Sequence, residues 1–201
     1  MMLFYRIMRG LAAFVARSVV RVRVRGLENV PDTGACVIAA NHIHALDPLL
    51  LAIVVRRPIC FMAKEELLRV PVFGWLVRRV GVFPVKRGKV DVQAIRHSLE
   101  VLAKGGALGI FPEGTRSKTG EIQEALGGAA MLSARGGAVL IPAAIDGEYR
   151  IGGSLRLCIG QPVAFSSATP GKLTGDERSL VTKVLMERIA ELRRQCLDES
   201  W

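Results

Sequence analysis

Residues 35–40, 41–47 and 48–55 read ACVIAA, NHIHALD and PLLLAIVV. The first segment is apolar and too short for a helix, so it predicts a buried strand. The last segment begins with Pro48 directly after Asp47, a pattern typical of a helix whose N-cap is the aspartate. The stretch therefore predicts a strand that leads through a short loop into a helix.

Similar strands and helices are predicted on both sides of this unit. Further strands are expected at residues 20–25, 61–62, 82–85, 107–111, 139–145 and 155–159, and further helices at 72–80, 91–104 and 124–135. A last helix should start at the capping-box pair Thr174 and Glu177 and bear the apolar residues Leu180, Val184, Ile189 and Leu192. Because strands alternate with helices, the sequence predicts an α/β fold: one domain with a central, largely parallel sheet flanked by helices. Ligand sites in such folds lie at the carboxyl ends of the strands.

The first 19 residues are expected to form a separate amphipathic helix. On a helical wheel Arg6, Arg9 and Arg17 share one side, and the opposite side carries Leu3, Phe4, Ile7, Leu11, Phe14 and Val15. An apolar side flanked by cations suits the surface of an anionic bilayer, and no stretch approaches the roughly 20 apolar residues of a spanning helix. Packing of this helix on its own domain explains the periodicity equally well. We expect residues 1–19 to associate with a membrane and residues 20–201 to form the folded domain.

Basic residues outnumber acidic ones, and the excess lies in the first half of the chain. The 201 residues include 28 Lys and Arg and 18 Asp and Glu, a formal net charge of +10. Residues 1–89 hold 15 of the basic and 5 of the acidic residues, whereas residues 90–201 hold 13 of each. Half of all residues are apolar, which excludes a disordered basic tail. A surface that faces phospholipid headgroups, a phosphorylated substrate or nucleic acid is expected.

A histidine and an aspartate follow the strand predicted at residues 35–40. His42 comes just after the strand, and Asp47 comes five residues later at the start of the predicted helix. An imidazole that titrates near neutral pH can take the proton of a hydroxyl, and a carboxylate on its other ring nitrogen would fix its tautomer. The alternative is that Asp47 is only an N-cap and His42 an ordinary loop residue. This spacing alone does not decide between the two.

Two further strand ends carry charged groups. The strand at 107–111 leads into residues 112–117, PEGTRS, a turn with a carboxylate, a hydroxyl and a guanidinium. Arginine can hold a phosphate through two parallel hydrogen bonds, and Gly114 lets the backbone approach a ligand closely. The strand at 82–85 ends in Lys86 and Arg87. Taken separately, the first is also compatible with a plain surface turn and the second with a solvated sheet edge.

Together these segments resemble the glycerolipid acyltransferases, typified by the lysophosphatidic acid acyltransferases. Those enzymes carry N-H-x-x-x-x-D, a block of the type G-x-x-F-x-x-R, F-P-E-G-T-R-S, and an apolar block that ends in proline. This sequence has residues 41–47, 81–87, 111–117 and 139–142 in the same order, and the resemblance extends over roughly residues 20–150. The resemblance implies that residues 20–201 form an acyltransferase domain.

The resemblance implies transfer of an acyl group from a thioester, acyl-CoA or acyl carrier protein, to a hydroxyl. The expected acceptor is the sn-2 hydroxyl of lysophosphatidic acid, which gives phosphatidic acid; another lysophospholipid, glycerol 3-phosphate or a lyso-ornithine lipid is the alternative. In this reading His42 is the general base and Asp47 orients it. The oxyanion donors are expected among the backbone N–H groups of residues 41–43. No metal, no other cofactor and no acyl-cysteine intermediate is implied.

The same resemblance assigns the substrate-binding residues. Arg87 and Arg116 match the family's phosphate-binding positions, and the positions expected to assist them are Lys64, Lys86, Gly114 and Thr115. Glu113 is expected to hold the glycerol portion of the acceptor or to pin Arg116.

Two features depart from the family pattern. His44 creates H-x-H-x-x-D, which invites comparison with metallo-hydrolases, but His97 is the only histidine left, so a two-metal site is not expected. Residues 125–129, ALGGA, lack the lysine that the family commonly has ahead of Gly-Ala. This second departure leaves donor and acceptor selection open.

The expected partners are an acyl thioester, a lysophospholipid and an anionic membrane surface. The four cysteines are widely separated and follow no secretory leader, so we expect a reduced compartment and the cytoplasmic face of the cell membrane. A nucleic-acid-binding module is the remote alternative, because only 5% of the residues are aromatic and no helix-turn-helix pattern is present. A catalytically silent lipid-binding scaffold is a third alternative, disfavoured by the joint presence of His42, Asp47, Glu113 and Arg116.

Overall fold

The computed structural model describes residues 2–86, 90–117, 119–166 and 171–198. In these residues a seven-stranded sheet has the order β1-β7-β6-β2-β5-β3-β4. The strands are β1 (Arg21–Arg25), β2 (Cys36–Ala40), β3 (Ile59–Lys64), β4 (Val82–Val85), β5 (Ala107–Ile110), β6 (Val139–Gly147) and β7 (Ser154–Ile159). Strands β6, β2, β5, β3 and β4 run parallel, β7 is antiparallel to β6, and β1 is parallel to β7. The prediction of a largely parallel sheet is confirmed.

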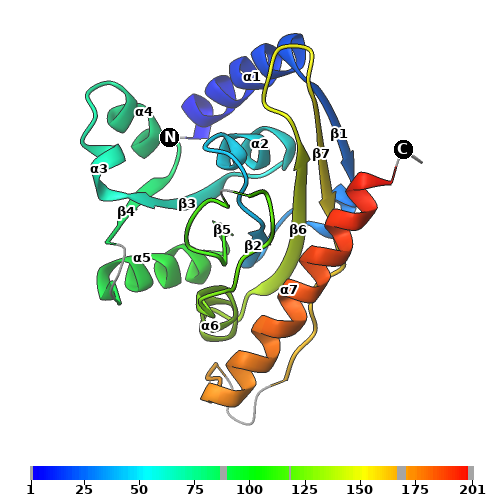
Figure 1. Cartoon of the computed structure of the whole chain (residues 1–201). Coiled ribbons are helices and arrows are strands. Elements are labelled where there is room, and N and C mark those ends of the chain that lie inside the picture. Colours follow the sequence, from blue (N-terminus) through cyan, green and yellow to red (C-terminus); the bar gives the residue numbers. More distant parts are fainter. Residues whose placement is uncertain (1, 87–89, 118, 167–170, 199–201) are drawn as a thin grey trace.

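Helices cover both faces of the sheet (Figure 1). On one face lie α1 (Met2–Val19) and α2 (Asp47–Val54), and on the other lie α5 (Val92–Ala103), α6 (Gly128–Arg135) and α7 (Gly175–Leu197). Beside β4 lie the short helices α3 (Glu65–Leu68) and α4 (Phe73–Arg79), and a 3₁₀ turn, η1 (Leu27–Asn29), follows β1. The α/β fold with flanking helices is therefore as predicted.

The central strand β2 divides the core into two layers. Ile38 and Ala40 pack on the side of α2, whereas Val37 and Ala39 pack on the side of α5, α6 and α7. All of β2 is fully buried, as expected for a parallel strand that is covered on both faces. Burial of each large aliphatic side chain stabilises the fold by about 1.5–3 kcal/mol, so this strand fixes the position of the loop that follows it.

The structure adds detail to two predicted helices. The helix expected at 124–135 begins only at Gly128, because Gly127 has a left-handed backbone (φ 69°) that ends the preceding loop. In α7 the buried residues are Val181, Leu185, Ile189 and Cys196. Leu180 is 63% exposed, because it lies one position away from this stripe. The predicted capping box of Thr174 and Glu177 is confirmed.

Helix α1 uses its two sides differently. Tyr5 is buried, and Arg9 donates hydrogen bonds to the carbonyl oxygens of Ile53 (3.3 Å) and Arg56 (3.2 Å) at the end of α2. The exposed side carries Ile7, Leu11, Phe14 and Val15, which are 52–71% exposed. The helix thus packs on the domain through one side and leaves apolar side chains outside on another. Of the helices in the described residues, none combines the length and the apolar content that a bilayer-spanning segment needs.

Candidate active site

Two loops at the carboxyl edge of the sheet meet around His42. One follows β2 and holds residues 41–46, and the other follows β5 and holds residues 111–117. Asn41 joins the first loop to β6: its side chain donates to the carbonyl oxygen of Ile145 (2.9 Å) and accepts from the N–H of the same residue (2.8 Å). Three neighbouring parallel strands therefore determine where His42 stands.

His42 and Asp47 form a buried pair. Nδ1 of His42 lies 2.8 Å from Oδ2 of Asp47, and the two residues are 8% and 0% exposed. The same oxygen accepts from the N–H of Ile43 and of His44, both at 2.7 Å. Because Oδ2 of Asp47 accepts hydrogen bonds from two backbone N–H groups, it is also the acceptor in its bond to the imidazole. Nδ1 of His42 therefore carries the hydrogen, and Nε2 is left as a base.

Asp47 is not the N-cap of α2, contrary to the sequence prediction. The helix begins at Asp47 itself, Leu46 precedes it as N-cap, and no side chain caps the first turn. The carboxylate instead turns back to the loop before the helix, where it binds the ring of His42 and two backbone N–H groups. Of the two alternatives for this spacing, the contacts favour the His–Asp pair.

Glu113 joins the two loops. Its Oε1 accepts from the N–H of His42 (2.9 Å) and its Oε2 accepts from the N–H of Gln123 (3.1 Å). Burial raises the pKa of Glu113, and these two N–H groups oppose that shift by favouring the charged form. Among the described residues Glu113 makes no ion pair with Arg116, so the expectation that it pins Arg116 is wrong. Its carboxylate fixes backbone position instead.

The turn after β5 contacts His42 at two more points. The ring of Phe111 stacks on the imidazole at 4.0 Å between centroids, and the N–H of Ser117 donates to the carbonyl oxygen of His42 (2.8 Å). Gly114 has φ 70°, and a Cβ at this position would lie 2.6 Å from Leu126, so the turn requires glycine. Thr115 and Arg116 are exposed at its tip.

Comparison with known proteins identifies the family. The chain matches a family model described as Acyltransferase over residues 21–146, a span that includes His42, Asp47, Glu113 and Arg116. The chain belongs to the acyltransferase family. The match covers more than half of the chain, and it includes both loops that meet around His42.

Individual relatives agree with the family. The 1-acyl-sn-glycerol-3-phosphate acyltransferase of Bacillus subtilis is 33% identical over 181 residues, which are 87% of this chain and 89% of that protein. The lyso-ornithine lipid O-acyltransferase of Pseudomonas aeruginosa is 36% identical over 169 residues, 78% of this chain and 62% of that protein. The crystal structure of the 1-acyl-sn-glycerophosphate acyltransferase PlsC from Thermotoga maritima has a TM-score of 0.73 at 26% identity, over 94% of this chain and 79% of that one. The chain spans 45% and 46% of the length of the chloroplast relatives that it matches in Arabidopsis thaliana and Brassica napus.

The other acyltransferase positions lie along the same edge of the sheet. Lys64 ends β3, is exposed, and pairs with Glu66 (3.2 Å). Lys86 follows β4, is also exposed, and donates its N–H to Asp91 (2.8 Å). Arg87 falls outside the described residues. The cations at 64, 86 and 116 thus follow three adjacent parallel strands.

One acyltransferase expectation needs correction. The N–H groups of His42 and Ile43 were expected to bind an oxyanion, but they already donate to Glu113 and Asp47. Of the other two histidines, His44 stacks its ring on Tyr149 with 4.2 Å between centroids, and His97 lies on α5 against Phe83. Among the described residues no three His, Cys, Asp or Glu side chains lie close enough together to hold a metal ion.

Tyr149 is the site residue that sequence reasoning missed. It lies on the hairpin between β6 and β7, and its hydroxyl donates to Oδ1 of Asp47 (2.6 Å). Aspartate and tyrosine are 102 residues apart, and no local pattern marks Tyr149. Only its place in the fold could have indicated Tyr149, because the hairpin begins at the same carboxyl edge of the sheet at which His42 lies.

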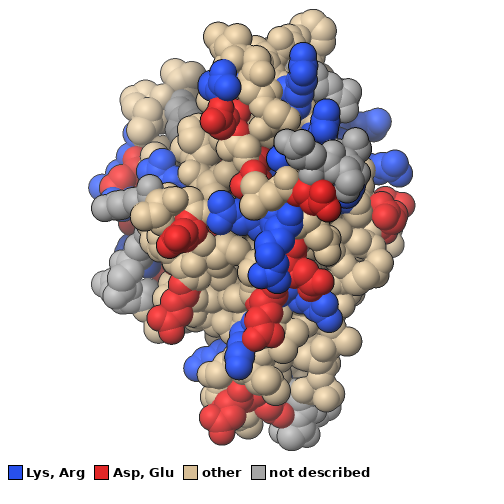
Figure 2. Space-filling model, turned by 45° about the vertical axis from the view of Figure 1, so that its right-hand side comes forward, with Lys and Arg blue, Asp and Glu red and all other residues tan. Residues whose placement is uncertain are grey.

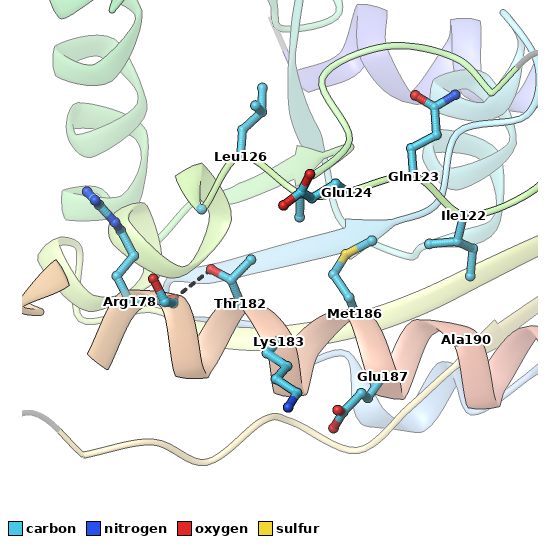
Figure 3. A pocket seen from close by; sticks show the side chains of 13 residues that line it. Ile122, Gln123, Glu124, Leu126, Arg178, Thr182, Lys183, Met186, Glu187 and Ala190 are labelled. Carbon is cyan, nitrogen blue, oxygen red and sulfur yellow. Dashed lines mark hydrogen bonds between the residues drawn. The ribbon is translucent and has the colours of Figure 1, made fainter. Parts of the chain in front are cut away.

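A groove of about 750 Å³ opens beside the turn after β5, between residues 122–127 and α7. Figure 3 shows Thr182 and Met186 reaching from α7 toward the loop, whereas Lys183 and Glu187 point away. Gln123 lines this groove and donates its N–H to Glu113. The groove therefore ends against the turn that contacts His42. One of its walls includes residues 125–127, part of the segment that lacks the family's lysine.

Proposed function

We propose that this chain transfers an acyl group from acyl-CoA or acyl carrier protein to the sn-2 hydroxyl of lysophosphatidic acid, giving phosphatidic acid. The observation that carries the proposal is the 2.8 Å pair of His42 and Asp47, joined through Glu113 to the turn that presents Arg116. The names of the acyltransferases from Bacillus subtilis and Thermotoga maritima support this acceptor.

In the proposed reaction His42 is a general base and then a general acid. Its Nε2 takes the proton of the acceptor hydroxyl, and the hydroxyl oxygen attacks the thioester carbonyl carbon. The C–S bond then breaks, and the thiol leaves with the proton that His42 returns. Asp47 stabilises the imidazolium that forms between these steps, and a base of this kind contributes about 10² to 10⁴ in rate.

The exposed cations at the edge of the sheet are proposed to bind the acceptor phosphate. Arg116 is the main candidate, because it lies next to Ser117, whose N–H donates to the carbonyl oxygen of His42. Lys64 and Lys86 follow the neighbouring strands β3 and β4, and Arg87 is the family position beside Lys86. Gly114 and Thr115 form the turn that carries Arg116, and guanidinium can hold a phosphate in a bidentate manner.

A membrane surface is proposed as the place where the acceptor is met, on the cytoplasmic side. The exposed apolar side chains of α1 support it, together with Trp75 on α4, which is 54% exposed and contacts Phe4 edge-to-face at 6.0 Å. Figure 2 shows broad uncharged surface at the top of the molecule, interrupted by basic and acidic groups, and charges of both signs lower down. An exposed apolar side with arginine nearby suits an anionic interface.

The test is a product assay on the purified chain. Lysophosphatidic acid and an acyl thioester should give phosphatidic acid by mass spectrometry, and His42→Ala should lower kcat by at least about 10²-fold. His97→Ala is the matched control, because His97 contacts Phe83 on the far side of the sheet from α2 and should leave the rate unchanged. A His42→Ala variant as active as the parent would refute the mechanism.

A second acceptor, a lyso-ornithine lipid, is favoured by the 36% identity to the Pseudomonas aeruginosa enzyme of that name. Arg116→Gln separates the two acceptors, because a lyso-ornithine lipid has no phosphate. If lysophosphatidic acid is the substrate, the KM for lysophosphatidic acid should be about tenfold or more higher in the variant. A rise of this size corresponds to the loss of one charge-assisted hydrogen bond. A higher kcat/KM of the parent for the lyso-ornithine lipid would instead establish the second acceptor.

A further inference from the structure

The hairpin between β6 and β7 brings a phenol to the carboxylate behind His42. The hydroxyl of Tyr149 lies 2.6 Å from Oδ1 of Asp47, and its ring stacks on His44 with 4.2 Å between centroids and an angle of 18°. Tyr149 is half-buried and packs against the apolar layer on the α2 side of the sheet. It lies beyond residues 21–146, the span of the family match, so the match says nothing of it.

The four hydrogen bonds to Asp47 are divided unequally between its two oxygens. Oδ2 accepts from the ring of His42 and from the N–H groups of Ile43 and His44. Oδ1 accepts from Tyr149, which is therefore the donor that fixes the outer oxygen and the rotation of the carboxylate. The carboxylate plane in turn sets the direction in which Nε2 of His42 points.

The phenol is a permanent donor in this position. Burial and the charge of Asp47 both disfavour the phenolate, so the pKa of Tyr149 is raised far above its usual value. Tyr149 consequently keeps its proton at every pH at which an acyltransferase of this kind is assayed. A hydrogen bond donated to a carboxylate withdraws negative charge from it and weakens its pull on the neighbouring imidazolium.

We propose that Tyr149 is a positioning residue that sets the basicity of His42 through Asp47. The inference rests on the proposed function for its kinetic consequence, but the Tyr149–Asp47–His42 chain is defined by contacts alone. Other ionisable groups face His42 as well: Glu113 accepts from its backbone N–H, and Arg193 of α7 exerts a charge effect on Glu113. Neither contacts the carboxylate of Asp47, and His44 contacts it only through its backbone.

The test is Tyr149→Phe, which removes the hydroxyl and keeps the ring on His44. Without the donated bond, Asp47 holds more negative charge and stabilises the imidazolium, so His42 should need a higher pH to become a base. The acidic limb of the pH profile of kcat/KM should move upward by about half a unit, and kcat should fall about tenfold. The same upward shift should be seen in the NMR titration of His42 without substrate.

Tyr5→Phe is the matched control, since it removes the chain's other phenol, which accepts from the N–H of Ile59 (3.4 Å). Tyr5→Phe should leave unchanged both the midpoint of the acidic limb of the kcat/KM profile and the midpoint of the NMR titration of His42. A Tyr149→Phe variant with unchanged midpoints, whatever its rate, would overturn the proposal and leave a packing role only. If the parent transfers no acyl group, the proposed function fails, and the NMR titration still decides whether Tyr149 acts on His42.

Discussion

Two carboxylates hold His42, and each holds a different part of it. Asp47 binds the ring and Glu113 binds the backbone N–H, so both the side chain and the backbone of His42 are held in place. Glu113 also binds Gln123 in the wall of the groove. A substitution of Glu113 should therefore displace His42 without removing the hydrogen bond between its ring and Asp47.

We predict that Glu113→Gln lowers kcat about tenfold and the free energy of unfolding by about 1–3 kcal/mol. An amide keeps one acceptor oxygen and turns its NH₂ toward the second N–H, which leaves a buried donor unpaired. Initial rates and urea unfolding measure the two effects. Glu121→Gln, at an exposed position in the next segment, is the control and should change neither. Equal rates for Glu113→Gln and the parent would show that the bridge is dispensable.

The arrangement of site residues within a single loop could be predicted from the sequence. His42 and Asp47 are five residues apart, and a strand followed by a helix leaves few ways to arrange them. The partner of Glu113 was not predictable, because a carboxylate beside arginine in sequence points to an ion pair, whereas the fold turns it to backbone N–H groups 71 and 10 residues away. Tyr149 could not be found for the same reason, since only the hairpin after β6 brings it near.

At the scale of elements, α7 closes the groove and one face of the core. It has 23 residues, and its buried stripe runs through Val181, Leu185 and Ile189 onto the sheet. The sequence predicts its start, because a capping box is a local pattern. Its buried side could not be predicted, because apolar residues lie on both sides of the stripe and only packing on β6 selects between them.

We predict that Leu185→Ala lowers the free energy of unfolding by about 3 kcal/mol, because Leu185 is fully buried and its loss leaves a cavity. Leu180→Ala is the matched control: the same substitution at a position five residues earlier and 63% exposed should change stability by less than about 0.5 kcal/mol. Urea denaturation followed by circular dichroism compares the two. Equal losses would contradict the observed orientation of α7.

At the scale of the whole molecule, helix α1 is linked to the active site through α2. α1 packs on α2, the helix that begins with Asp47, and presents Ile7, Leu11, Phe14 and Val15 outward. The sequence predicts this helix, but it left open whether the apolar side faces the domain or a bilayer. In the structure one side packs on the domain through small residues and Tyr5, while larger apolar side chains stay exposed on another side.

We predict that replacing Leu11 and Phe14 together by Asn weakens binding to phosphatidylglycerol-containing vesicles at least tenfold. Each of these side chains would contribute about 1.5–3 kcal/mol by leaving water. Vesicle flotation measures the bound fraction. Val92→Asn is the control, because Val92 is 72% exposed but lies on α5, on the other face of the sheet. Undiminished flotation of the double variant would count against α1 as the contact with lipid.

The end of α1 is also bonded to the hairpin that carries Tyr149. The N–H of Gly152 donates to the carbonyl oxygen of Val19 (2.8 Å), and the N–H of Arg21 donates to Gly153 (2.9 Å). A chain shortened by its first 19 residues would lose the acceptor for Gly152, and the loop bearing the phenol would loosen. Such a shortened enzyme should then turn over slowly even on detergent-dispersed lipid, so poor catalysis after trimming would not by itself mean failed delivery to the bilayer.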